Sequence, residues 1–262
     1  MPRVAGLYFE SHGPEEAPAL LFSSGLGGSA GYWAPNLDAF TKTHRVLLYD
    51  HRGTGRSDRN LPPRLRVGDM AQDVLTILDA AAVEKATLIG HAAGGAIGLS
   101  LAARAPERLD RLVVINGWSA PDPHFARCFE ARLALLKGSG VRAFIRAQPL
   151  FLYPPNWISQ NSAHLDAEED ALIEHFPGIE SLEARVAALL AFDIAARLPD
   201  IATPTLLIVA DDDMLVPPRA SDHLLAALPA AQIARMTGGH ACNVTNPDQF
   251  NRLVVAWLTA AP

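Results

Sequence analysis

The feature that most constrains the fold of this chain is an alternation of short apolar runs with helical segments. Six runs rich in valine, isoleucine and leucine recur, most of them too short for helices and without apolar–polar alternation, at residues 19–25, 45–50, 86–91, 111–116, 205–210 and 231–236. Such runs are typical of parallel strands that are covered on both faces. Helical patterns lie between them at residues 69–82 and 94–105. The alternation predicts an α/β fold with a doubly wound, mostly parallel sheet.

One long segment breaks this alternation. Residues 119–200 are helical and aromatic in pattern and contain no convincing strand, and the strand–helix pattern resumes at IATPTLLIVA. Ligands of open α/β sheets bind at the carboxyl ends of the strands. We therefore predict that residues 1–118 and 201–262 form the core, and that residues 119–200 form a helical lid inserted over that edge of the sheet.

Composition excludes several other classes of protein. Hydrophobic residues make up 49% and charged residues 19% of the 262 positions, which predicts a well-buried core. The net charge of −6 argues against a nucleic-acid partner, which would favour a basic face. We see no signal-peptide pattern and no run of about 18 apolar residues, so we expect no membrane span. Two cysteines without zinc-like spacing favour a reduced, cytoplasmic setting. A homodimer is expected only because most soluble oligomers are dimers.

The sequence Gly90-His91-Ala92-Ala93-Gly94 follows an apolar run and opens a helical segment of small residues. A strand, a tight turn and a helix are the context of a nucleophile elbow, in which flanking glycines make room for a strained turn. Ala92 occupies the position that the nucleophile takes in such an elbow. The pattern therefore predicts an elbow whose tip is vacant, with the Ala93 N–H directed into the site.

A second glycine-rich turn, SSGLGGS at residues 23–29, ends an early apolar run. Such a loop can offer a backbone N–H to a developing oxyanion, and we expect this donor to be Leu26, paired with the N–H of Ala93. A phosphate-binding loop is the competing interpretation, and it is weaker because no Gly-Lys-Ser/Thr follows. Asp50, which ends the next run, is expected to organise the turn that comes after it.

An acid and a histidine follow the last two apolar runs. Three adjacent aspartates occur in VADDDMLVP, and because like charges cannot all be buried together, the spacing to the following proline selects Asp213. Asp211 and Asp212 are expected to be solvated or to cap. His240 lies in TGGHACN, on a loop before the final helical pattern. Position 92, Asp213 and His240 follow the chain order of a hydrolase triad.

These motifs resemble the α/β-hydrolase superfamily over nearly the whole chain. A narrower resemblance rests on SGLGGSAGYW, YDHRGTGRSD, NGW, RCFEAR, AQPLFLYPPNW and GGHACNVTNPDQFN, which are similar to protein D of the bacterial pyrimidine-utilisation (Rut) pathway. The lid and histidine strings are the specific ones. The resemblance implies an elbow that naturally carries alanine and a hydrolase of carbamate or aminoacrylate in uracil degradation.

An alanine at position 92 excludes an acyl-enzyme, which is the route that this fold takes for esters and unactivated amides. Carbamate and aminoacrylate are labile, and their breakdown needs a proton moved rather than a covalent intermediate. His240, held in one tautomer by Asp213, suits that task. The sequence therefore favours general acid/base catalysis without a serine nucleophile.

A small-molecule substrate with a carboxylate is expected to need a cationic anchor, for which a bidentate arginine is best suited. Arg127, Arg132 and Arg146 lie in the predicted lid, and Arg127 or Arg132 is favoured, although each could equally lie on a solvated face. Aromatic residues that could line the pocket or simply pack the core and lid are Trp33, Trp118, Tyr153 and Trp157.

Three alternatives remain open at this stage. The chain could be a serine esterase inactivated by alanine at position 92, a non-catalytic small-molecule-binding member of the fold, or a cofactor-free oxygenase that uses His240 as its base. Histidine spacing of the HExxH type is absent, so we predict no metal and no cofactor. Cys128 and Cys242 lie outside the elbow and are not expected to be nucleophiles. His91 is expected to support the turn.

Overall fold

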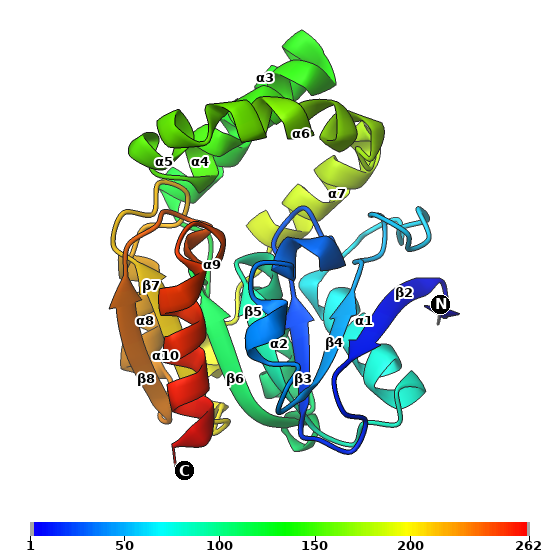
Figure 1. Ribbon diagram of the computed structural model, residues 1–262, viewed down its shortest axis with the longest axis vertical. Helices are drawn as coiled ribbons and strands as arrows, with labels where there is room; N and C mark the ends of the chain where they lie inside the picture. The colour runs from blue at the N-terminus through cyan, green and yellow to red at the C-terminus, as the bar shows by residue number, and fades with distance from the viewer. Residues whose placement is uncertain (1–2, 261–262) are drawn as a thin grey trace.

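The computed structural model describes residues 3–260 and has an eight-stranded sheet at its centre (Figure 1). The strands are β1 (Arg3–Val4), β2 (Leu7–His12), β3 (Ala19–Ser23), β4 (Arg45–Tyr49), β5 (Ala86–His91), β6 (Leu109–Ile115), β7 (Thr205–Ala210) and β8 (Ala231–Met236). Their order is β1-β2-β4-β3-β5-β6-β7-β8. The six strands from β3 to β8 pair in parallel and confirm all six predicted runs, while β1 and β2 form an antiparallel edge that the sequence pattern did not reveal.

Each face of the sheet is covered, as the continuous apolar strands require. On one face α1 (Val67–Ala80), α2 (Ala93–Arg104) and α8 (Arg219–Ala227) pack on alternate strand residues such as Leu21 and Leu88. On the other face η1 (Ala30–Trp33) and α10 (Pro247–Thr259) pack on the intervening residues. The remaining short elements outside the lid helices named below are η2 (Leu37–Ala39), η3 (Pro106–Arg108), η4 (Ala195–Asp200) and α9 (Cys242–Thr245).

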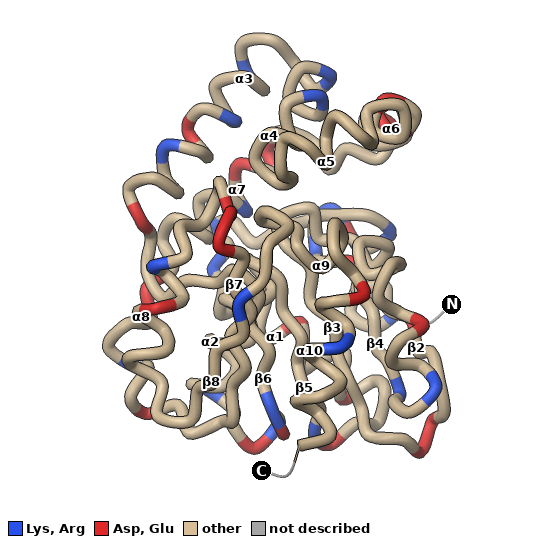
Figure 2. The backbone as a smooth tube through the Cα atoms, turned by 60° about the vertical axis from the view of Figure 1, so that its left-hand side comes forward, with Lys and Arg blue, Asp and Glu red and all other residues tan. Residues whose placement is uncertain are grey.

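The segment between β6 and β7 is helical and lies above the carboxyl ends of the parallel strands (Figure 1). Its helices, which we call the lid, are α3 (Pro123–Ala147), α4 (Pro149–Leu152), α5 (Pro155–Gln160), α6 (Ser162–Glu174) and α7 (Ile179–Leu190). That the insertion is a unit bounded at residues 119 and 200 stays a prediction. Acidic and basic residues are interspersed along both lid and core (Figure 2). Within residues 3–260, no helix has the length and apolar character needed to cross a bilayer.

Candidate active site

The elbow between β5 and α2 has the strained geometry that its glycines suggest. Ala92 has φ 50° and ψ −106°, a conformation that costs an alanine about 1–3 kcal/mol and persists only where the surroundings impose it. A Cβ on Gly90 would lie 2.3 Å from the Gly94 carbonyl oxygen, and one on Gly94 would lie 2.0 Å from that of Ser23. The turn therefore needs both glycines, and it places Ala92 at the end of β5 with 5% of its surface exposed.

Asp213 and His240 form a buried pair at the neighbouring strand ends. Asp213 Oδ2 accepts from His240 Nδ1 at 2.8 Å, and the two side chains are 1% and 3% exposed. Asp213 Oδ1 accepts the backbone N–H groups of Leu215 and Val216 at 2.7 and 3.0 Å, which fixes the carboxylate. Because an ionised carboxylate only accepts hydrogen bonds, Nδ1 carries the proton and Nε2 keeps the basic lone pair. This arrangement can take up and release a proton at Nε2, the atom that a general acid/base uses.

The two preceding aspartates have other partners. Asp211 forms an ion pair with Arg235, and Asp212 accepts the backbone N–H groups of Gly238 and Gly239. Asp212 thus ties the loop that carries His240 to the loop that carries Asp213. Of the three aspartates, the structure brings only Asp213 to the imidazole.

Asn116, which the sequence analysis did not single out, pins the histidine loop to the sheet. Its Nδ2 donates to the His240 carbonyl at 2.8 Å, and its Oδ1 accepts the Ala210 N–H at 2.8 Å. Asn116 follows β6 with φ 48°, a left-handed conformation that asparagine tolerates. A polar asparagine as the last residue of the predicted run at 111–116 was the available signal.

His91 supports the same carbonyl from the elbow. Its Nε2 hydrogen-bonds the His240 carbonyl oxygen at 2.8 Å, and its ring centroid lies 4.7 Å from that of His240. Burial lowers the pKa of His91 well below its usual value, and the neighbouring His240 lowers it further, so His91 is neutral at pH 7. These contacts place the imidazole of His240 beside the elbow.

The two expected oxyanion donors are free. Ala93 is the first residue of α2, and neither its N–H nor that of Leu26 donates a hydrogen bond to any group within residues 3–260. The Gly28 N–H bonds the Gly25 carbonyl at 3.0 Å, so Leu26 lies inside a closed β-turn. Asp50 organises the turn that follows it, as expected: its carboxylate accepts the Arg56 N–H at 2.8 Å, and it also accepts the Ala30 N–H at 2.8 Å.

The arginines expected in the lid differ in their surroundings. Arg127 is exposed on α3, and Arg146 pairs with Asp166 and Glu169 on α6. Arg132 is 6% exposed and has no carboxylate partner among residues 3–260. Its guanidinium donates to the Gln148 side chain and lies over three rings, with centroid distances of 5.0, 5.7 and 5.5 Å to Phe129, Phe144 and Phe151.

Arg132 lies on the part of α3 that approaches the acid loop. Cys128, one helical turn earlier, has its Sγ 3.9 Å from the carbonyl oxygen of Met214, the residue after Asp213. The Nε of Arg132 is buried without a hydrogen-bond partner. Burial lowers the pKa of Arg132 to about 10, so the group is still a cation at pH 7.

The two cysteines do not have the properties of nucleophiles. Burial raises the thiol pKa of Cys128, and it raises that of Cys242 to about 12, whereas a nucleophilic thiol has a lowered pKa.

The aromatic candidates fall into two groups. Tyr153 lines a cavity of about 590 Å³ together with Asp213, and Trp157 packs on the Tyr153 ring with centroids 4.5 Å apart. Trp118 is buried against Phe125, and its Nε1 has no partner. Trp33 requires a correction. It is 1% exposed and packs in the core below η1, because its ring contacts Phe22, Tyr32 and Phe250, so it does not belong to a pocket at the elbow.

Within residues 3–260 no three histidine, cysteine, aspartate or glutamate side chains form a group that could hold a metal ion. The Nδ1 of His91, on the ring beside His240, is an unpartnered acceptor, because the Nε2 of His91 donates to the His240 carbonyl. Unpartnered N–H donors are also present: the backbone N–H groups of Leu26 and Ala93, and the side-chain nitrogens of Trp118 and Arg132. Such a set suits an anionic or carbonyl-bearing ligand.

Comparisons with known proteins agree with this geometry. The family described as alpha/beta hydrolase fold matches residues 18–247. The chain is 50% identical over 261 residues to a Caulobacter vibrioides protein named "Putative carbamate hydrolase RutD", covering 98% of this chain and 97% of that protein. A protein of the same name from Pseudomonas savastanoi pv. phaseolicola is 49% identical, with 94% and 95% covered. Among solved structures, the enol-lactonase from Burkholderia xenovorans LB400 superposes with a TM-score of 0.88 at 26% identity, covering 98% of both chains. The chain therefore belongs to the α/β-hydrolase fold family and, within it, to the RutD family.

Proposed function

We propose that this protein hydrolyses a small, labile C–N compound, carbamate or aminoacrylate, in pyrimidine degradation. In this proposal His240 and Asp213 act as a general acid/base pair, and no covalent bond to the protein forms. One observation carries the proposal: a buried, hydrogen-bonded Asp213–His240 pair lies beside an elbow that keeps its strained turn although its tip, Ala92, has no nucleophile. The relatives named carbamate hydrolase support the substrate class.

Both reactions require a proton transfer that an imidazole can perform. Carbamate releases carbon dioxide and ammonia once its nitrogen is protonated, and the proton comes from the imidazolium of His240. Aminoacrylate tautomerises to an imine, and water adds to the imine carbon. In that addition His240 takes a proton from the water and returns it to the nitrogen, which gives a carbinolamine. His240 then moves the hydroxyl proton of this adduct to its amino nitrogen, so that the C–N bond breaks, ammonia leaves and a carbonyl forms. A positioned acid/base typically contributes about 10²–10⁴-fold to the rate.

The remaining site residues have separable tasks in this proposal. In the aminoacrylate reaction the N–H groups of Leu26 and Ala93 stabilise the negative charge that develops on the adduct oxygen as its proton leaves. Arg132 binds the substrate carboxylate, for which its unpartnered Nε and the absence of a carboxylate partner within residues 3–260 make it better suited than the exposed Arg127. Tyr153 lines the cavity beside Asp213, and Trp118 offers its unpartnered Nε1 to the substrate.

The decisive experiment measures ammonia release from freshly generated carbamate or aminoacrylate. His240→Ala is expected to lower the enzymatic rate by about 10²–10⁴-fold, toward the uncatalysed background. His164→Ala, which changes an exposed lid histidine, is the matched control and should keep the wild-type rate. Equal rates for wild type and His240→Ala, both at background, would reject catalysis on these compounds.

The same preparation distinguishes the alternative of a disabled serine hydrolase. Under our proposal Ala92→Ser gives at most a weak esterase and does not accelerate ammonia release, because the C–N reactions need no acyl-enzyme. Strong ester hydrolysis by Ala92→Ser, with no ammonia release by wild type above background, would favour the alternative.

A further inference from the structure

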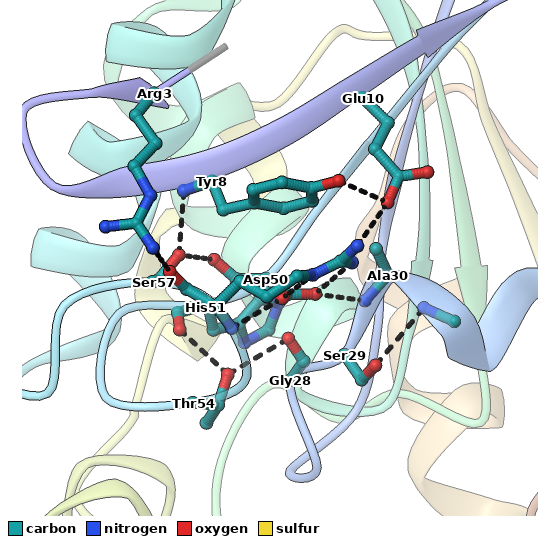
Figure 3. Close-up of polar contacts among 12 residues, drawn as sticks. Arg3, Tyr8, Glu10, Gly28, Ser29, Ala30, Asp50, His51, Thr54 and Ser57 are labelled. Carbon is teal, nitrogen blue, oxygen red and sulfur yellow. Dashed lines mark hydrogen bonds and ion pairs between the residues drawn. The ribbon is translucent and has the colours of Figure 1, made fainter. Parts of the chain in front are cut away.

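The loop that carries Leu26, residues 25–29, is held from below by the turn that follows β4. The His51 N–H donates to the Gly28 carbonyl at 2.7 Å, and Thr54 Oγ1 donates to the same carbonyl at 3.1 Å and to the His51 carbonyl at 2.8 Å (Figure 3). Asp50 accepts the Ala30 N–H where the loop enters η1 (Figure 3). These contacts fix the end of the loop but do not reach the Leu26 peptide.

The Leu26 peptide is held from above by Arg185 of lid helix α7. Arg185 Nε and Nη2 both donate to the Leu26 carbonyl, at 3.2 and 2.9 Å. The same guanidinium donates to the Arg52 carbonyl at 3.2 Å and to His51 Nδ1 at 2.9 Å. A single lid side chain thus joins α7, the loop of residues 25–29 and the turn after β4.

Arg185 is an unusual group for this position. It is 1% exposed and has no carboxylate partner among residues 3–260, so a full positive charge is buried against neutral acceptors. Burial of an unpaired charge is costly, and it lowers the pKa of Arg185 to about 10. A hydrophobic side chain would pack the same space without that penalty. Compared with a hydrophobic side chain, the guanidinium of Arg185 adds the hydrogen bonds to the loop of residues 25–29.

Close packing around Gly28 shows how tightly the three segments meet. Gly28 has φ 70°, and a Cβ there would lie 2.6 Å from Thr54 Oγ1 and 3.0 Å from both Arg185 Nη2 and the His51 Cβ. Only φ and ψ of Leu26 separate its free N–H from the carbonyl that Arg185 holds. Because the turn is also closed by the Gly28-to-Gly25 hydrogen bond, fixing that carbonyl limits the direction of the N–H.

We propose that Arg185 is a positioning residue that couples the lid to the oxyanion hole, by holding the Leu26 carbonyl so that the Leu26 N–H faces the substrate. The inference rests on the role of Leu26 in the proposed function. It predicts that the oxyanion donor is in place only when α7 is seated on the core. A lid that also carries the anchor Arg132 would then assemble both binding groups together.

The test compares Arg185→Met and Arg185→Lys with Arg142→Met. Arg142 is the matched control because it is a lid arginine whose ion pairs with Glu169 and Asp170 stay within the lid. Each change is made in the wild type and in Ala92→Ser, where hydrolysis of p-nitrophenyl acetate depends on the oxyanion hole whatever the natural substrate is. Amide hydrogen exchange of residues 25–29 is measured in the wild-type background.

In the Ala92→Ser background, Arg185→Met is expected to lower kcat about 10- to 100-fold, since small misplacements of a catalytic group cost that much. KM should change by less than about threefold, because a purely transition-state contact is lost. Exchange of residues 25–29 should quicken at least about tenfold relative to Arg142→Met. Arg185→Lys should lie between, because an ammonium can reach the Leu26 carbonyl but cannot span all three acceptors.

Unchanged kcat together with unchanged exchange in Arg185→Met would overturn the coupling. If Ala92→Ser has no measurable esterase activity, the exchange comparison decides alone. Failure of both Arg185 variants to fold would also reject the proposal, because it would assign Arg185 to the stability of the whole fold. A wild type without ammonia release would reject the proposed function and leave the exchange and esterase results to stand on their own.

Discussion

The two helices that connect the lid to the core each bury one arginine, and the structure treats the two guanidinium groups differently. Arg185 on α7 makes four hydrogen bonds, all to backbone carbonyls and a neutral histidine. Arg132 on α3 has one hydrogen-bond partner, the Gln148 side chain, and its Nε is left without any. Both guanidinium groups are buried cations, and neither has a carboxylate partner within residues 3–260.

This difference distinguishes a buried charged side chain that stabilises the structure from one that can bind a ligand. A buried guanidinium whose three nitrogens all have partners has little capacity left for a ligand, whereas a buried nitrogen without a partner carries a penalty that a ligand can remove. By this criterion α7 contributes a side chain that holds the protein together at the loop of residues 25–29. The other connecting helix, α3, contributes a buried cation whose Nε has no partner, the group to which the proposed function assigns the substrate carboxylate.

Among the changes that test the contrast between the two arginines, Arg132→Met is expected to have the largest effect, and it acts on substrate binding. Loss of a charge-assisted, two-point contact should weaken carboxylate binding by about 2–4 kcal/mol, which raises KM about 30- to 700-fold. Steady-state kinetics of ammonia release measure it. The control is Arg127→Met on the exposed face of the same helix, which should raise KM far less. A larger rise in KM for Arg127→Met than for Arg132→Met would show that Arg127, and not Arg132, binds the substrate carboxylate.

Lowering the pH should destabilise the contacts that Arg185 of α7 makes and leave those of Arg132 of α3 unchanged. Burial lowers the pKa of His51 well below 6.5, and the adjacent Arg185 lowers it further, whereas Gln148 and the rings around Arg132 do not titrate. The unfolded chain therefore binds the proton first, so stability is lost as pH falls below 6.5, by up to about 1.4 kcal/mol per pH unit for each such histidine. Urea unfolding between pH 7 and 5 measures the slope.

His91 contributes in the same direction, because burial also lowers its pKa. His51→Gln, which keeps an acceptor for Arg185, should remove the His51 share of the slope and protect residues 25–29 from acid-induced exchange. His164→Gln, at an exposed lid position, should leave the slope unchanged. If His51→Gln keeps the full slope, the histidine beside Arg185 is not the sensitive group.

The smallest effect expected is that of Gln148→Glu. A carboxylate at this position would pair with Arg132 inside the protein and compete with the substrate carboxylate, raising KM by about tenfold, or 1.4 kcal/mol. Thermal stability should rise or stay level, since a buried cation gains a partner. Gln72→Glu on the exposed face of α1 controls for the added charge. Unchanged KM in Gln148→Glu would indicate that the guanidinium is not the substrate anchor.

The core of the fold could be predicted from the sequence because its signals are local. The six runs from residues 19–25 to 231–236 became β3 to β8, and the glycines around Ala92 became a strained elbow. The edge strands β1 and β2 were missed, because a two-residue and a six-residue strand on an antiparallel edge have no long continuous apolar run. Trp33 was misplaced because an aromatic near a glycine-rich loop packs either into a pocket or into the core.

The sequence by itself determined the fold class, the vacant elbow and the chain order of Asp213 and His240. Tertiary structure alone decided that Asn116 pins the histidine loop, that Arg132 is the buried lid cation with a free donor, and that Arg185 holds Leu26. The physical reason lies in the partners. Arg185 and Leu26 are 159 residues apart, and the acceptor is a backbone carbonyl, which every residue type possesses. A contact of that kind leaves no residue pattern in the chain and exists only where folding brings the two segments together.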